Sequence, residues 1–339
     1  MKTFSGKSDL WRFRTKTFLF EISVLFHVTL VLTYSYFTYV ERPTIQRRME
    51  MHDSIVMGTA PYQYRYRVLV PYAAEALMKP LSLLPGMKSA ESLHVRLQNR
   101  PFMLAYGILN FAAIMAFLIS MRALLKQWFP WSMALLGVLL TAIVMSVTFR
   151  DHYFHPWSFW EATLYALGLY LIVSKKFFLF TVTNLIGVVN RETSCFLPLM
   201  FLLSVIPRSP KDWLPALKRR DMLLALLNLA IWALAFAILH KLVGYAPATF
   251  TISKAWHGNK SMLLYSLFMN AIFLGPLWVF ALKGFISSAP SFIRRASLAV
   301  IPYVALLSLI GFWWEVRYWI PMLPILIPAT IASVQTPQG

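Results

Sequence analysis

Residues 150–161 bring together the side chains in this sequence that are best suited to chemistry. They read Arg-Asp-His-Tyr-Phe-His-Pro-Trp-Ser-Phe-Trp-Glu and lie between two long apolar stretches. Asp151 is a candidate base or metal ligand, and a helical turn would point His152 and His155 in the same direction. Asp151 and His155 would suit a divalent cation, the only cofactor that the sequence suggests. Ionisable residues beside membrane helices are costly away from water, so this turn is a site candidate.

The alternative for this turn is an ordinary helix start. Pro156 and Ser158 suit the first turn of a helix, and Glu161 suits the positive end of its dipole. This alternative accounts well for Ser158 and Glu161, and poorly for Asp151 and the two histidines.

A second candidate group lies in residues 50–72, where Glu-Met-His-Asp is followed by alternating tyrosine and arginine. Arginine binds phosphate through two parallel hydrogen bonds and always stays charged. Arg65 and Arg67 are therefore candidates for binding a lipid-linked phosphate near Asp53, a candidate catalytic acid. The alternative is anchoring of these side chains at the membrane surface. Residues 71–84 predict an amphipathic helix in the interface.

Two shorter groups also carry charge at the ends of apolar segments. Arg191 and Glu192 are candidates either for binding a sugar hydroxyl or for forming an ion pair between helices. Glu315 and Arg317 are two residues apart, so on a helix they would not face each other, and we expect them to reach different partners. Tyr318 and the neighbouring tryptophans suit a membrane-interface belt or stacking against a sugar.

Composition indicates which elements position these groups. The chain is 58% hydrophobic and 13% charged, whereas soluble domains carry about 25% charged residues. We predict an all-α, polytopic integral membrane protein, with residues 1–339 as one transmembrane domain and residues 41–100 as its first extracytoplasmic loop. About ten membrane helices are expected, at residues 18–40, 101–121, 131–149, 158–174, 177–190, 195–207, 222–243, 262–283, 296–312 and 318–333.

The distribution of charge predicts the orientation of the chain. The expected cytoplasmic segments hold 17 basic residues and the short loops opposite hold 6, so both termini are predicted to be cytoplasmic. Nine of the 13 acids fall on the other side, which predicts an extracytoplasmic working surface. The net charge of +19 fits a basic membrane face that contacts anionic lipids, and we expect no nucleic-acid partner.

The arrangement of these groups resembles the GT-C superfamily of polytopic membrane glycosyltransferases. The resemblance is carried by Pro-Tyr-x-Tyr-Arg-Tyr-Arg-Val-Leu-Val-Pro at 61–71, Arg-Glu-Thr at 191–193 and Glu-Val-Arg-Tyr-x-x-Pro-x-x-Pro at 315–324. These stretches are similar to bacterial membrane proteins placed near that superfamily. The acid-x-acid pair usual in the superfamily is absent, because Glu50 and Asp53 are three apart.

The resemblance implies inverting transfer of a sugar from a polyprenyl-phosphate carrier to an envelope glycan or lipid, at the outer face of a bacterial inner membrane. Asp53 would be the base and Asp151 the second acid. Arg65, Arg67 and Arg317 would stabilise the departing phosphate. The remaining candidates would hold sugar or acceptor: His152, His155, Arg191, Glu192, Glu315 and Tyr318.

Two functions of other classes remain open at this point. One is a transporter or flippase for a lipid-linked saccharide, which would need charged residues along a path through the bilayer. The other is a catalytically silent subunit of a polysaccharide assembly complex, in which the outer acids would be mutually paired rather than facing an open cavity.

Overall fold

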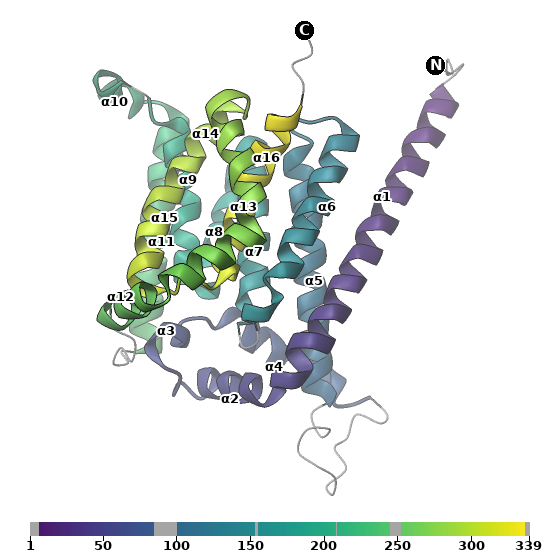
Figure 1. The fold of residues 1–339 in the computed structure, drawn as a ribbon, viewed down its shortest axis with the longest axis vertical. Coiled ribbons are helices and arrows are strands. Elements are labelled where there is room, and N and C mark those ends of the chain that lie inside the picture. The colour runs from purple at the N-terminus through teal and green to yellow at the C-terminus, as the bar shows by residue number, and fades with distance from the viewer. Residues whose placement is uncertain (1–6, 85–99, 153–154, 208, 245–251, 336–339) are drawn as a thin grey trace, which may run out of the picture.

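A computed structural model describes residues 7–84, 100–152, 155–207, 209–244 and 252–335. Every regular element in these ranges is a helix, and they contain no strand (Figure 1). The prediction of an all-α protein is confirmed. The α-helices are α1 Lys7–Tyr36, α2 Ile45–Val56, α3 Tyr62–Arg65, α4 Leu69–Leu81, α5 Arg100–Leu125, α6 Trp131–Val147, α7 Trp157–Val173, α8 Phe177–Asn190, α9 Phe196–Val205, α10 Trp213–Ala216, α11 Arg220–Val243, α12 Ile252–Ser261, α13 Leu263–Ser287, α14 Ser291–Ala296, α15 Val300–Ile310 and α16 Leu323–Val334.

Short segments of other helical types connect several of these elements. One is a π-helix, η1, at Phe37–Glu41. The others are 3₁₀ segments: η2 Arg42–Thr44, η3 Phe149–His152, η4 Glu192–Cys195, η5 Pro210–Asp212, η6 Ser297–Ala299 and η7 Val316–Met322.

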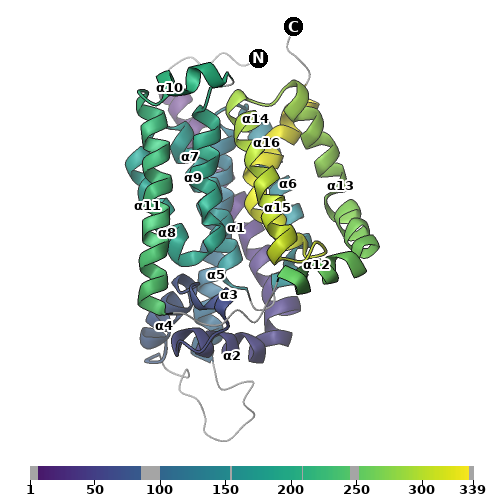
Figure 2. The same ribbon diagram turned by 90° about the vertical axis from the view of Figure 1, so that its left-hand side faces the viewer.

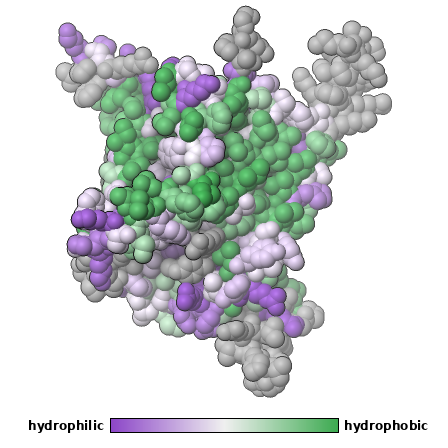
Figure 3. Space-filling model, viewed as in Figure 1, coloured by the Kyte–Doolittle hydropathy of each residue, from purple (hydrophilic) through white to green (hydrophobic). Residues whose placement is uncertain are grey.

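The long helices have the length and composition of membrane spans. Six helical stretches among the described residues are long and apolar enough to cross a membrane, and four shorter apolar helices accompany them at 131–147, 157–173, 177–190 and 192–205. Hydrophobic residues form a broad band across the middle of the molecule, with hydrophilic residues at both ends (Figure 3). This distribution suits a protein embedded in a bilayer.

The two ends of the helical bundle differ in structure. The start of α1 and the end of α16 lie at the same end, together with α10 and α14 (Figures 1 and 2). Helices α2, α3 and α4 form a layer at the opposite end. The first and last helices therefore begin and end on one side, as predicted; the assignment of that side to the cytoplasm stays a prediction.

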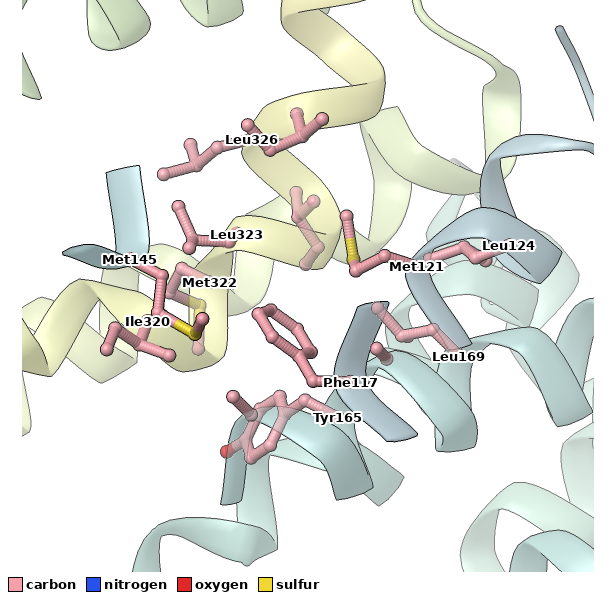
Figure 4. Packing of buried hydrophobic residues seen from close by; sticks show 14 of the residues in the cluster. Phe117, Met121, Leu124, Met145, Tyr165, Leu169, Ile320, Met322, Leu323 and Leu326 are labelled. Atoms are coloured by element: carbon pink, nitrogen blue, oxygen red, sulfur yellow. The ribbon is translucent and has the colours of Figure 1, made fainter. Parts of the chain in front are cut away.

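Helix α16 forms the centre of the bundle. Ten consecutive residues, from Leu323 to Ala332, are buried, and the helix packs against α5, α6, α7 and α13. Figure 4 shows the packed cluster around it, to which α5 contributes Phe117 and Met121 and α7 contributes Tyr165. A helix that is apolar all round must be buried on all sides or face lipid; here it is enclosed by protein.

A Gly284→Ala substitution should destabilise the contact between α13 and α16. A Cβ atom at Gly284 would lie 2.0 Å from the carbonyl oxygen of Ala329, and small residues permit such close approach of helices. We expect the free energy of unfolding to fall by roughly 1–3 kcal/mol, measured as a lower melting temperature in detergent. Gly275→Ala on the same helix is the control, because its Cβ would meet no atom within 4 Å; equal losses in both variants would contradict the explanation.

The region after the first helix differs from the prediction. The sequence predicts a helix at 18–40 and then a loop, whereas the helical chain continues from α1 through η1 and η2 into α2. The predicted amphipathic helix at 71–84 is observed as α4, which packs against α2, α5 and α8. The change from α-helix to π-helix and 3₁₀ geometry after Tyr36 redirects the chain from α1 into the α2–α4 layer (Figure 1).

Helices α8 and α9 are short, and the break between them positions charged residues. Arg191, directly after α8, has an extended backbone with φ −167° and ψ 142°. The following η4 starts the return of the chain into α9, which packs against α7, α11 and α14. Because α8 ends early, α4 can pack against it, and the α8–α9 connection meets the α2–α4 layer.

Candidate functional site

Three arginine–glutamate pairs lie where the α8–α9 connection meets η7 and the residues around α3. Arg67 pairs with Glu192, and its Nε lies 3.2 Å from Oε2 of that carboxylate. The Nη1 atom of Arg191 lies 2.5 Å from Oε2 of Glu161. Nε of Arg317 donates to Oε2 of Glu315 at 2.8 Å. We call these six residues the ion-pair cluster: Arg67, Glu161, Arg191, Glu192, Glu315 and Arg317.

Aromatic rings contact all three arginines, and the Tyr318 ring contacts two of them. The guanidinium carbons of Arg191 and Arg317 lie 5.5 Å and 4.6 Å from the ring centre of Tyr318. The guanidinium carbon of Arg67 lies 5.0 Å from the ring of Trp157 and 5.2 Å from that of Tyr64. Such contacts between cations and ring faces hold guanidinium groups in fixed orientations. The cluster is therefore a rigid group of three arginines drawn from distant parts of the sequence.

Backbone contacts position the Arg191 side of the cluster. The Asn190 side chain donates to the carbonyl of Trp157 at 3.1 Å, and the Tyr165 hydroxyl donates to the carbonyl of Thr193 at 2.5 Å. The Thr193 hydroxyl donates to Glu161. These bonds tie the break after α8 to the first turns of α7.

The expectation that Glu315 and Arg317 reach different partners is wrong, because these two residues pair with each other. The expectation assumed helical geometry at both positions. Glu315 instead has an extended backbone, with φ −83° and ψ 90°, and precedes η7. An extended residue next to a 3₁₀ turn can direct its carboxylate toward a side chain two positions further on.

The cluster contains buried hydrogen-bond donors without partners. Among the described residues, Nε of Arg191, Nη1 of Arg317 and Nε1 of Trp157 have no hydrogen-bond partner. Unpaired buried donors cost free energy. The carboxylates at the edge are more accessible: the Glu192 side chain is 30% exposed and that of Glu315 is 21% exposed. The cluster thus has unpaired donors on its inner side and two partly accessible carboxylates at its edge.

A second polar group adjoins the cluster at the corner between α1 and α2. Arg48 donates to Glu41 at 3.1 Å and also to the hydroxyl of Tyr36. Asn110 donates to the other oxygen of Glu41 at 3.1 Å. The Tyr36 hydroxyl donates to the backbone carbonyl of His152 at 3.0 Å. This group fixes η3, and with it the turn that leads into α7.

His52 anchors α2, and the neighbouring Asp53 faces outward. His52 is buried, and its two ring nitrogens lie 2.9 Å from the Tyr106 hydroxyl and 2.9 Å from a Glu75 oxygen. Asp53 is exposed, and among the described residues its carboxylate makes no hydrogen bond or ion pair. The structure does not bring Asp53 into contact with the ion-pair cluster.

The remaining predicted site residues have different outcomes. Arg65 ends α3 and is half-buried. The side chain of Asp151 lies outside the described residues, so its predicted role stays a prediction. Where the structure describes side chains, no group of three His, Cys, Asp or Glu residues could hold a metal ion. A cation held by Asp151 and His155 likewise stays a prediction.

Both histidines of the predicted turn are buried against the cluster. Burial, followed by the charges of Arg317, Arg191 and Arg48, lowers the pKa of His152 well below 6.5. Burial, followed by the nearby arginines, also lowers the pKa of His155 well below that value. Both rings are therefore neutral at pH 7, and Nε2 of His152 lies 3.1 Å from the Thr148 hydroxyl. His152 therefore contributes a hydrogen bond rather than a positive charge.

Acidification should destabilise the protein through these histidines. Below pH 6.5 the unfolded chain binds protons at positions where the folded protein stays neutral, so the free energy of unfolding falls as pH falls from 7 to 5. A His152→Gln variant should lose part of this dependence in melting curves recorded in detergent across that range. His257→Gln, at an exposed residue of α12, is the control and should keep the full slope; an unchanged slope in His152→Gln would contradict the assignment.

Sequence reasoning missed several of the residues that build the site. Glu161 was interpreted as a helix-start acid, but it is buried and paired with Arg191. Glu41 and Arg48 received no role, although the structure pairs them across the turn from η1 into α2. The position of these residues in the sequence could have indicated that they are paired, because charged residues at the ends of apolar segments need a partner.

The ion-pair cluster has no counterpart from which its function could be transferred. No protein-family model, no curated protein and no solved structure matches this chain.

Proposed function

We propose that this protein is a membrane glycosyltransferase that transfers a sugar from a polyprenyl-phosphate donor to an envelope glycan or lipid. The observation that carries the proposal is the convergence of Arg67, Arg191 and Arg317 with unpartnered buried donors at one end of an apolar bundle. A phosphate group would accept hydrogen bonds from these donors, and its charge would be stabilised by the guanidinium groups.

The proposed reaction needs no cofactor in its bond changes. Asp53 takes the proton from the acceptor hydroxyl, whose oxygen attacks the anomeric carbon. The bond between that carbon and the phosphate oxygen breaks, and the polyprenyl phosphate leaves with the electron pair. Arg67, Arg191 and Arg317 stabilise the charge that develops on the phosphate. Asp53 is preferred as base because Glu192 and Glu315 are each engaged by an arginine, whereas among the described residues Asp53 forms no ion pair.

The topology that accompanies this proposal is a GT-C-like arrangement. All ten apolar helices would cross the membrane, with α2, α3 and α4 on the extracytoplasmic side of a bacterial inner membrane. The concentration of paired charges beside the α2–α4 layer supports a one-sided site.

A second candidate function is a catalytically silent subunit of a polysaccharide assembly complex. It is favoured by the pairing of Glu41, Glu161, Glu192 and Glu315 with arginines, since each of these carboxylates is already engaged by a cation. The two candidates are separated by reconstituting the purified protein with polyprenyl-phosphate sugars and a lipid or glycan acceptor. Release of polyprenyl phosphate with formation of a glycosidic bond supports the enzyme; its absence across a panel of sugars supports the subunit.

An Arg317→Gln variant should bind polyprenyl phosphate about 10- to 100-fold more weakly, because one charge-assisted hydrogen bond contributes roughly 1.5–3 kcal/mol. The affinity of Arg317→Lys should lie between that of Arg317→Gln and that of the wild type. Lysine keeps the positive charge but lacks the planar guanidinium group that can donate two parallel hydrogen bonds. Affinity can be measured by the quenching of tryptophan fluorescence in detergent. Glu315→Gln is the matched control, because it removes the pairing partner and keeps the arginine. Equal affinity in Arg317→Gln and wild type would remove this residue from the phosphate site.

A further inference from the structure

A polar pocket lies at the end of the bundle opposite the ion-pair cluster. Its volume is about 340 Å³, and its lining comes from the α5–α6 and α7–α8 turns and from helices α9, α11 and α14. This end carries α10 and α14 (Figures 1 and 2). The pocket therefore lies where the membrane-spanning part of the bundle meets one of its hydrophilic ends.

Three charged residues of both signs line this pocket. Lys175 is exposed, and Asp221 and Arg295 are half-buried. Among the described residues, no ion pair joins either base to Asp221. The Nε atom of Arg295 is buried and has no hydrogen-bond partner, while its Nη1 reaches the Ser204 carbonyl at 3.4 Å. Opposite charges thus line one pocket without forming an ion pair with each other.

Stacked aromatic rings form apolar walls beside these charges. The rings of Trp128 and Phe292 lie 6.2 Å apart between centres, and those of Phe177 and Phe201 lie 5.5 Å apart. Phe178, directly after Phe177, is 80% exposed on the outer surface of α8. The pocket therefore joins a charged end to an apolar surface, as a bound phospholipid requires.

We propose that this pocket binds the headgroup of one phosphatidylethanolamine molecule. Lys175 and Arg295 bind the phosphate, and Asp221 accepts hydrogen bonds from the ammonium group. The acyl chains lie against the apolar surface of the bundle beside Phe178. A headgroup with both charges matches the lining better than a purely anionic one, because Asp221 would repel a second negative charge. The proposal does not depend on the glycosyltransferase activity.

The test uses the full-length protein in detergent and counts bound lipid by native mass spectrometry. We expect the wild type to retain one phosphatidylethanolamine and to bind it about tenfold more tightly than phosphatidylglycerol, the difference that one charge-assisted contact supplies. A Lys175→Gln/Arg295→Gln variant should lose both lipids. Asp221→Asn should lose the preference for ethanolamine and keep phosphatidylglycerol binding.

A matched control carries the same kinds of change outside the pocket. Lys218→Gln/Asp212→Asn alters exposed residues at the same end of the bundle and should bind as the wild type does. Melting curves without added lipid establish that each variant is folded. Equal binding of the two lipids by the wild type, or equal losses in the control, would overturn the proposal. Binding of water-soluble glycerophosphoethanolamine as tightly as the lipid would overturn the assignment to a membrane lipid.

Discussion

An Arg191→Met variant is expected to lose roughly 3–5 kcal/mol of folding free energy, the usual cost of leaving one member of a buried ion pair alone. Its partner Glu161 is 1% exposed in its side chain, so the remaining carboxylate would have no access to water. Glu161 also accepts a hydrogen bond from the Thr193 hydroxyl. This neutral hydroxyl cannot replace the positive charge of Arg191. The measurement is the melting temperature of the solubilised protein, together with the yield of folded protein from membranes.

The double variant Glu161→Met/Arg191→Met provides the control for this prediction. Replacing both members of a buried pair by apolar groups is often neutral or stabilising, so the double variant should recover most of the lost stability. If the double variant is as unstable as Arg191→Met, the loss does not come from an unpaired charge. If Arg191→Met melts as the wild type does, the pair is not a structural element of the fold.

The second large effect concerns catalysis. Under the proposed function, Asp53→Asn should lower the rate of sugar transfer roughly 100- to 10,000-fold, the contribution typical of a general base. Asp53 is exposed on α2, so the substitution should leave the melting temperature unchanged. The rate is measured as polyprenyl phosphate released from a lipid-linked sugar by the reconstituted protein.

Glu50→Gln is the matched control for Asp53, because Glu50 is also exposed on α2, three residues earlier. It should transfer sugar at the wild-type rate. Full activity in Asp53→Asn would exclude this residue as the base. If Glu315→Gln loses activity instead, Glu315 at the edge of the ion-pair cluster would be the base.

Much of the fold follows from local features of the sequence. Apolar runs near or above the length of a bilayer crossing predict helices such as α5 and α11, because lipid leaves no other way to satisfy the backbone. The amphipathic spacing at 71–84 predicts α4 for a similar reason. The path of the chain after Tyr36 could not be predicted, since the π-helix and 3₁₀ segments depend on packing against other helices.

The types of the site residues were also visible in the sequence, but their pairing was not. Arg191 and Arg317 are recognisable as charges at the ends of apolar segments, a position that requires a partner, and Arg67 as part of an alternating tyrosine–arginine stretch. Which carboxylate each one binds depends on how α7, α8 and η7 pack together, over separations of up to 125 residues. Glu315 shows this most directly, because its extended backbone reverses the prediction made from helical spacing.

The sequence by itself therefore determined that this is an all-α membrane protein with acids and arginines at the ends of its helices. Apolar residues must be removed from water and backbone groups must be hydrogen-bonded, and both requirements act locally along the chain. The hydropathy of the sequence therefore predicts where the helices form. Only the tertiary structure decided that Glu161 binds Arg191, that Glu192 binds Arg67, and that Asp53 stays outside the cluster. Those choices depend on the distances between helices far apart in the chain, and no local pattern encodes such distances.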